Sequence, residues 1–167
     1  MSDEQFKALW QVVLNNTTVA DDSIHGPQHW LRVERNGLYL SRFNGANETV
    51  LQLFALFHDC MRLNDGTDDG HGQRGAEHAK QLRSSFLEID DDSFDLLYLA
   101  CSGHTDQLFD DDVTIATCWD ADRLDLGRVG IVPDPAFLNT EEAKQIAQES
   151  RLDYLEQIPI RRINERA

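Results

Sequence analysis

The sequence is poor in basic residues: 15 Lys and Arg stand against 30 Asp and Glu, which gives a formal net charge of −15 over 167 residues. A chain this acidic repels polyanions, so we exclude binding along a long nucleic acid or on an anionic membrane. Cysteines are few as well. Cys60, Cys101 and Cys118 are an odd number, lack a CxxC pattern and lie in apolar stretches. They predict reduced core thiols in a cytoplasmic protein.

The sequence also lacks a long apolar run. Its longest apolar stretch, residues 50–57, is interrupted by Gln52 and is far too short to cross a bilayer. The first residues, Met1 to Glu4, are acidic and do not resemble the basic start of a secretion signal. We therefore expect no membrane partner.

Alternation of apolar and polar residues, the pattern of a β-strand, is absent over any useful length. Apolar residues recur instead at three- and four-residue intervals, as in helices with one buried face. The chain length and a hydrophobic content of 41% fit one domain. We predict an all-α, single-domain bundle of about six to eight helices over residues 1–167. The expected helices are 3–15, 27–43, 46–63, 75–87, 94–102, 113–126 and 140–158, with a loop at 64–72.

Five of the six histidines, together with two aspartates, are the most informative feature. His58 and Asp59 lie within an apolar predicted helix, and burying such a pair is costly unless it is partnered or binds a cation. Adjacent helical side chains point about 100° apart, so a shared ion needs ligands from other helices. His29 and Asp122 are the candidates. Imidazole and carboxylate ligands together suit divalent transition metals.

Three ordered segments around these residues resemble the HD superfamily of metal-dependent phosphohydrolases, which are all-helical. Residues 29–33 (HWLRV) resemble the family's opening His-x-x-x-Val helix, residues 56–59 (LFHD) its central helix, and residues 121–124 (ADRL) its closing Ala-Asp segment. The resemblance implies an HD core over about residues 24–130, with helices 3–15 and 140–158 packed on it. It also implies a metal site made by His29, His58, Asp59 and Asp122.

Asp120 is an alternative to Asp122, because the two are two residues apart and cannot point the same way on a helix. The resemblance of the Ala-Asp segment to ppGpp hydrolases and cyclic nucleotide phosphodiesterases favours Asp122. Asp120 and Asp125 are then predicted to orient the ligand imidazoles.

A second metal ion is implied by two further histidines. His71 opens a segment that resembles the His-x-x-x-Gly-Ala segment of binuclear HD proteins such as the HD-GYP phosphodiesterases, and His104 lies where that subgroup places its next ligand. The alternative is one ion, with His71 and His104 contacting the substrate. We expect one or two divalent ions, from among Mn, Fe, Co, Ni, Zn and Mg. His78 has no motif behind it and is expected to be structural.

Three residues are predicted to act in catalysis. The spacing of His25 and His29 resembles the His-Asn-x-x-His of cyclic nucleotide phosphodiesterases, whose first histidine is a general acid; the alternative is that His25 caps a helix. Asp59 is expected to serve as ligand and proton acceptor. Arg62 occupies the place of the lysine in the His-Asp-x-Gly-Lys segment of HD-GYP proteins and could anchor a phosphate bidentately.

Together these features predict a metal-dependent phosphohydrolase that attacks a small phosphate ester, such as a nucleotide, with a metal-activated water. The same ligands serve HD-type diiron oxygenases acting on small polar substrates, and a non-catalytic metal- or nucleotide-binding module is a further alternative. Divalent ions and Arg62 can make the site locally positive within an acidic surface, so a small phosphorylated substrate remains compatible with the charge. The sequence does not indicate an oligomeric state.

Overall fold

The computed structural model describes residues 1–20, 22–149 and 152–160, and these residues form helices and no strand. The all-α prediction is confirmed. The α-helices are α1 (Asp3–Asn16), α2 (Pro27–Asn44), α3 (Glu48–Phe57), α4 (His71–Phe86), α5 (Asp91–Gly103), α6 (Val113–Arg123), α7 (Glu141–Gln148) and α8 (Leu152–Gln157), and two 3-10 helices are η1 (Leu124–Val129) and η2 (Pro135–Phe137).

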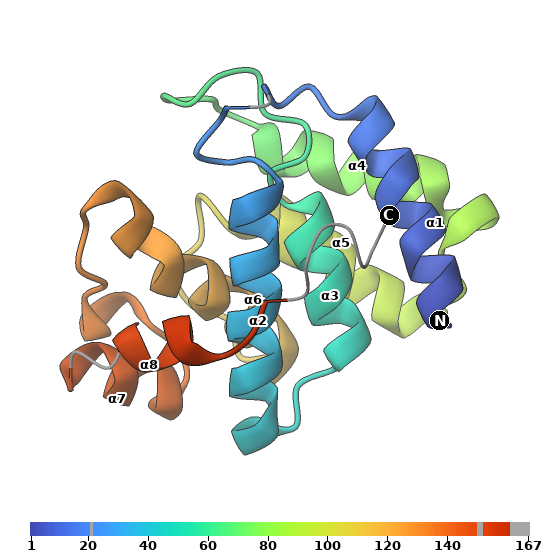
Figure 1. Ribbon diagram of the computed structural model, residues 1–167. Coiled ribbons are helices and arrows are strands. Elements are labelled where there is room, and N and C mark those ends of the chain that lie inside the picture. The colour runs from blue at the N-terminus through green and yellow to red at the C-terminus, as the bar shows by residue number, and fades with distance from the viewer. Residues whose placement is uncertain (21, 150–151, 161–167) are drawn as a thin grey trace.

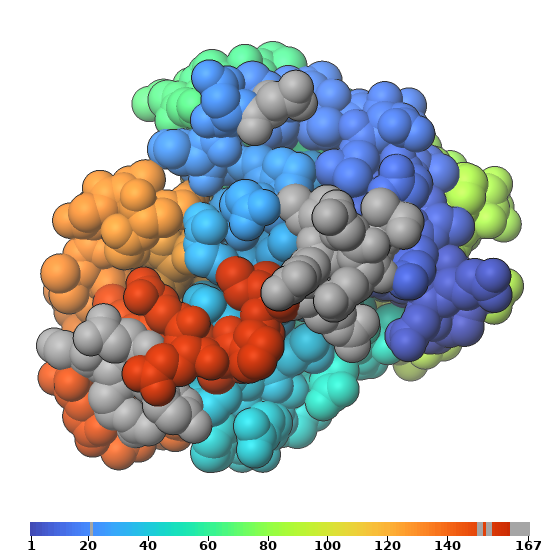
Figure 2. All heavy atoms as spheres, viewed as in Figure 1, coloured from blue at the N-terminus to red at the C-terminus, as the bar shows by residue number. Residues whose placement is uncertain are grey.

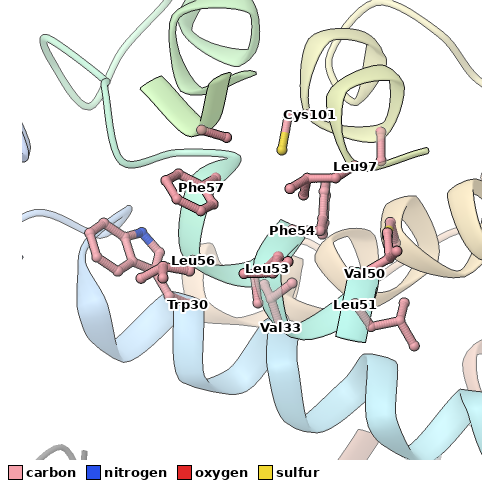
Figure 3. Close-up of a cluster of buried hydrophobic side chains, with 14 of the residues drawn as sticks. Trp30, Val33, Val50, Leu51, Leu53, Phe54, Leu56, Phe57, Leu97 and Cys101 are labelled. Atoms are coloured by element: carbon pink, nitrogen blue, oxygen red, sulfur yellow. The ribbon is translucent and has the colours of Figure 1, made fainter. Parts of the chain in front are cut away.

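Helices α2 and α3 lie side by side at the centre of the bundle (Figure 1). Pro27 begins α2, where a residue without an N–H loses no helical hydrogen bond. Asn47 caps α3 by accepting hydrogen bonds from the backbone N–H groups of Thr49 and Val50. Side chains of α3 point both toward α2 and toward α5, so α3 is buried between them (Figure 3).

The end of α3 differs from the prediction. A helix to residue 63 was expected, but α3 ends at Phe57, and His58 and Asp59 follow it in tight turns. The hydroxyls of Thr17 and Thr18 donate to the carbonyls of Cys60 (2.6 Å) and Arg62 (2.7 Å), which a continuing helix would need for itself. The His-Asp pair is therefore at a helix end.

Other boundaries shift for similar local reasons. Helix α4 starts at His71 rather than residue 75, because Gly70 adopts a left-handed conformation (φ +79°) that starts the helix early. The helix expected over 113–126 ends at Arg123 and continues as η1. The helix expected over 140–158 is two helices, α7 and α8, between which residues 150 and 151 lie outside the described part.

Helix α4 approaches its neighbours closely because glycines replace side chains at two contacts. A Cβ atom on Gly72 would lie 2.4 Å from the carbonyl oxygen of Cys101, and one on Gly75 would lie 2.2 Å from that of Phe57. These distances are shorter than any real carbon–oxygen contact. The two glycines thus bring the start of α4 against the ends of α3 and α5.

The core is made of two clusters of buried apolar side chains. The larger one contains Trp10, Trp30 and Trp119 and is built mainly from α1 to α6. The smaller one, around Leu40 and Ile146, joins α2 to α7 and α8. All three cysteines are buried and unpaired, as predicted. No helix in the described residues combines the length and the apolar character that crossing a membrane requires.

Candidate metal centre

The structure brings all seven candidate residues of the sequence prediction into one cluster, and each comes from the end of a helix. His25 precedes α2 and His29 lies in its first turn, whereas Asp59 follows α3. The residues of the cluster are His25, His29, His58, Asp59, His71, His104 and Asp122. Their potential ligand atoms form three overlapping groups, in each of which the atoms lie within 4.8 Å of one another.

Asp59 connects two halves of the cluster. Its Oδ2 lies 3.6 Å from the Nε2 atoms of both His29 and His58. Its Oδ1 lies 3.1 Å from Nε2 of His71 and 3.6 Å from Nε2 of His104. One carboxylate thus has an oxygen directed at each of two histidine pairs.

Asp122 completes the first half. Its Oδ1 lies 3.2 Å from Nε2 of His29 and 3.9 Å from Nε2 of His58. The two Nε2 atoms are themselves only 3.1 Å apart. The first half therefore groups two imidazole nitrogens with one oxygen of Asp122, and Oδ2 of Asp59 lies 3.6 Å from the same two nitrogens.

In four of the five histidines, namely His29, His58, His71 and His104, the other ring nitrogen is held by an acceptor outside the cluster. Nδ1–H of His29 donates to Asp125 (2.7 Å), and that of His58 donates to the carbonyls of residues 54 and 55 (3.1 Å each). Nδ1–H of His71 donates to the carbonyl of residue 68 (2.7 Å), and that of His104 to the carbonyl of residue 101 (2.8 Å). Nε2 is therefore the nitrogen that each ring offers to the cluster, with a lone pair when the ring is neutral.

This arrangement fits divalent cations. Donors around an ion with bonds of about 2.1 Å are separated by about 3.0 Å in an octahedron and about 3.4 Å in a tetrahedron. The separations described above run from 3.0 to 3.9 Å, including 3.0 Å between Nε2 of His71 and Nε2 of His104. Oδ1 of Asp59 is buried and accepts no hydrogen bond from the described residues. A bound cation would neutralise this oxygen and separate the facing lone pairs.

The pKa shifts of the cluster residues also fit a cation site. Burial lowers the pKa of His58 to about 3, so this ring is neutral near pH 7 and its Nε2 lone pair is available. Burial opposes the charged form of His29 too, but hydrogen bonds to Asp122 and Asp125 outweigh it and raise the pKa of His29. Burial alone would raise the pKa of Asp59, yet the surrounding histidines hold it well below its usual range.

Asp125 and Asp120, both predicted to orient ligand imidazoles, differ in the structure. Asp125 accepts from His29 and, through its other oxygen, from Nε of Arg32 (2.7 Å). Asp120 instead accepts from the backbone and side chains of Asn139 and Thr140, at 2.7 to 3.0 Å. The prediction for Asp120 is wrong, because a residue two positions before Asp122 faces the other side of α6. Asp120 fixes the start of α7.

The guanidinium group of Arg62 is bound mainly by loop carbonyls and faces the histidine cluster through one nitrogen. Its Nη2 donates to the carbonyl of Gly66 (2.7 Å) and its Nε to that of Asn64 (3.3 Å). Only Nη1 faces the cluster, 3.0 Å from Nε2 of His71 and 3.5 Å from Oδ1 of Asp59. The loop carbonyls thus use the nitrogens that a bidentate phosphate contact would need, so the structure does not present the edge predicted for Arg62.

His25 does not cap α2, since the capping position is Gly26 and no side chain caps the helix. Nδ1–H of His25 donates instead to Oδ2 of Asp59 (2.7 Å).

One contact of the cluster was not predicted from the sequence: the hydroxyl of Thr105 lies 3.1 Å from Nε2 of His71. Its place next to His104 was the only signal available.

No protein-family model and no curated protein matches the chain. Among solved structures, the chain is similar to the crystal structure of a predicted HD superfamily hydrolase from an uncultured Thermotogales bacterium. The two are 25% identical, the match covers 89% of this chain and 86% of that chain, and the TM-score is 0.68. The chain has the HD superfamily fold.

The HD fold confirms the resemblance carried by the three sequence segments. Those segments lie in α2, at the end of α3 and at the end of α6. The similarity to a predicted hydrolase and the His/Asp groups of the cluster together support a hydrolase in general, with a divalent metal as cofactor. The individual ligand assignments remain predictions, now with a geometry that can be tested.

Proposed function

We propose that this HD protein is a metal-dependent phosphohydrolase acting on a small phosphate ester, such as a nucleotide. The observation that carries the proposal is the position of Asp59 between two histidine pairs, with one oxygen directed at each. In this position Asp59 would offer one oxygen to each of two ions. Such a pair of ions suits phosphate esters, because it can act on the attacking and the leaving oxygen together.

Two ligand sets follow from the geometry. His29, His58 and Asp122 would hold one ion, with Oδ2 of Asp59 as a further ligand, and Asp59, His71 and His104 would hold the other. Bound there, the ions would polarise a phosphoryl oxygen and lower the pKa of a coordinated water to about 7. Four imidazoles favour Mn, Fe, Co, Ni or Zn over Mg, which prefers oxygen ligands.

The substrate reaches the cluster from the side of Asp122 and His25. The side chain of Asp122 is 23% exposed and that of His25 is 14% exposed, whereas those of His29 and His58 are fully buried. His29 and His58 would thus bind a metal ion from the buried side of the cluster. Asp122 and His25 line the side from which the substrate approaches.

His25 is the residue placed to move a proton. Its Nδ1–H is held by Asp59, so in the doubly protonated imidazolium form its Nε2–H can be given to the leaving oxygen of the ester, which leaves the neutral ring. Asp59 itself suits this task poorly, because its pKa is held well below the usual range and it stays charged at neutral pH. We therefore assign Asp59 to metal binding and the proton to His25.

The test begins with the metal content of protein purified without added metal. The protein is then loaded with Mn, Fe, Co, Ni, Zn or Mg and assayed without oxygen for phosphate release from phosphomonoesters, nucleotides and cyclic nucleotides. Release under these conditions supports the proposal. Oxygen consumption by the iron form, with no anaerobic phosphate release from any loaded form, would overturn it in favour of an oxygenase. No turnover, with thermal stabilisation by a nucleotide, would indicate a binding module.

Two variants separate the roles of the histidines. His58→Ala removes a buried ligand and should lose most of the bound metal, measured by elemental analysis. His25→Ala should retain the metal and lower turnover about 10²–10⁴-fold, the usual contribution of a general acid. Metal loss from His25→Ala would instead assign His25 as a ligand, since its ring lies within reach of the His29 and Asp59 donors.

A further inference from the structure

A cleft of about 620 Å³ lies beside the cluster, between the start of α2, η1 and α8. Its volume is within the range of roughly 300–1,000 Å³ typical of small-molecule sites. On the face shown in Figure 2, these three segments adjoin in blue, orange and red. His29 and Asp125 belong to the wall of the cleft and also to the histidine cluster with its supporting contacts. The cleft therefore begins where the candidate metal centre ends.

Three arginines line this one cleft in a chain with a net charge of −15. Arg128 is used structurally, because its Nε and Nη1 donate to the carbonyls of Ile24 and Asp125. Arg32 uses its Nε on the carboxylate of Asp125, and its two Nη atoms make no hydrogen bond with the described residues. Those Nη atoms are available to a ligand.

Arg35 is the least satisfied of the three. It is only 8% exposed, and its Nε and Nη2 donate to a single amide oxygen, that of Asn36, at 3.2 and 3.0 Å. Within the described residues it forms no ion pair with a carboxylate. A buried guanidinium without a counter-charge is costly, and burial accordingly lowers the pKa of Arg35.

The acidic residues of the cleft leave this charge unneutralised. Asp125 already accepts from His29 and Arg32. Asp22 and Glu156 are exposed, and neither forms an ion pair with an arginine of the cleft among the described residues. Asp125 and, less strongly, Glu156 attract Arg35 at longer range. The wall of the cleft thus carries three carboxylates and three guanidinium groups, and among the described residues Arg35 is the guanidinium without a paired carboxylate, with a competing carboxylate on α8.

We infer that this cleft binds a second anionic group of the substrate, a phosphate or carboxylate apart from the reacting ester, through Arg32 and Arg35. The inference rests on the proposed function. Arg32 and Arg35 follow His29 by three and six residues on α2, which places them about 4.5 and 9 Å further along the helix axis. Guanidinium groups suit planar recognition of such oxyanions. The substrates are thus small molecules with two anionic groups roughly one to two helical turns apart.

The first test measures binding of inorganic phosphate to the metal-free protein by isothermal titration calorimetry. Arg35→Gln should weaken binding at least about tenfold, as expected for loss of a charge-assisted contact. Glu156→Gln should tighten binding, because it removes the competing carboxylate. Arg42→Gln, on the same helix but outside the cleft, is the control and should bind like the wild type. Equal binding by wild type and Arg35→Gln, or no binding by the wild type and Glu156→Gln, would overturn the inference.

The second test uses the metal-loaded enzyme and a matched pair of esters. One is a nucleoside monophosphate, and the other is the same monophosphate carrying a second phosphate group. Arg35→Gln should raise KM about tenfold for the doubly phosphorylated ester and leave KM for the other unchanged. An unchanged KM for both esters means that the cleft proposal fails while the hydrolase stands. If neither ester is hydrolysed, the proposed function fails, and the phosphate titration still decides the cleft. Glu156 is exposed, so Glu156→Gln gives a result even if Arg35→Gln folds poorly.

Discussion

At the scale of single residues, substitutions of Asp122 and Asp120 distinguish a residue that binds metal from one that supports the structure. Asp122→Asn weakens a candidate ligand and should lose much of the bound metal, with little change in the fold. Asp120→Asn should retain the metal and lower the stability by about 1–3 kcal/mol, because donors of Asn139 and Thr140 lose a buried acceptor charge. Elemental analysis and thermal unfolding of both variants check this. The assignment is wrong if Asp120→Asn is the variant that loses metal.

His78 gives a prediction that depends on pH. Its ring is buried on α4 against Phe57, its Nε2 lacks a hydrogen-bond partner among the described residues, and burial lowers its pKa. Below pH 6.5 the folded protein therefore binds a proton at His78 less readily than the unfolded chain does. Its contribution to stability is present above about pH 6.5 and is lost as the pH falls below it.

Replacing His78 by Gln removes this term. The stability of His78→Gln relative to the wild type should rise as the pH falls from 8 to 5, by at most about 1.4 kcal/mol per pH unit. Urea unfolding of both proteins, in buffer that contains a metal chelator, measures the difference in their free energies of unfolding at each pH. Two parallel curves would show that His78 titrates alike in the folded and unfolded states.

The sequence was informative about which residues meet but less so about how they are used. His29, His58, Asp59 and Asp122 could be grouped because the family resemblance links their segments. The role of Arg62 could not be predicted, since it depends on two loop carbonyls whose direction is set by backbone conformation.

At the scale of elements, the helix ends carry the site. Apolar periodicity predicts that helices form, because it records which face is buried. It cannot predict where α3 stops, since the hydroxyls of Thr17 and Thr18, which donate to the carbonyls of Cys60 and Arg62 just after α3, lie more than 40 residues earlier in the chain. His58 and Asp59 consequently lie in a turn rather than 100° apart on a continuous helix.

The close packing of α4 against α3 can be tested at Gly75. A methyl group there would lie 2.2 Å from the carbonyl oxygen of Phe57, so Gly75→Ala must push the two helices apart. We expect a loss of about 1–3 kcal/mol in stability and weaker metal retention, because His71 moves with α4. Thermal unfolding and elemental analysis provide the two measurements.

Gly127→Ala is the matched control for this change. A methyl group on Gly127 meets no atom within 4 Å, so its stability should stay within about 0.5 kcal/mol of the wild type. If Gly75→Ala were as stable as this control, the contact with Phe57 would not fix the position of α4.

At the scale of the whole molecule, charge separates long polyanions from small anions. The net charge of −15 is spread over the protein, whereas Arg32 and Arg35 lie in one cleft. We predict no measurable binding of a labelled oligonucleotide of about 20 nucleotides at about 50 mM salt. Fluorescence anisotropy checks this. Binding that weakens as salt is added would mean that a basic surface outweighs the overall charge.

The fold class could be predicted from the sequence, but the arginine cleft could not. Helical periodicity and three motif segments were sufficient for an HD-type bundle, and the similar solved structure agrees. The cleft depends on α2, η1 and α8 meeting, and Glu156 lies more than 120 residues after Arg32. No local sequence pattern predicts that these three segments lie together.

The hydrogen bonds from the four Nδ1 atoms have one further consequence, for the entropy of metal binding. Each ring is held in one orientation by a carbonyl in or beside a helix end, or by the carboxylate of Asp125, which Arg32 also contacts. Ordering a free side chain on binding costs about 0.5–1.5 kcal/mol. In this protein folding has already ordered all four rings, so this cost is not incurred again when an ion binds.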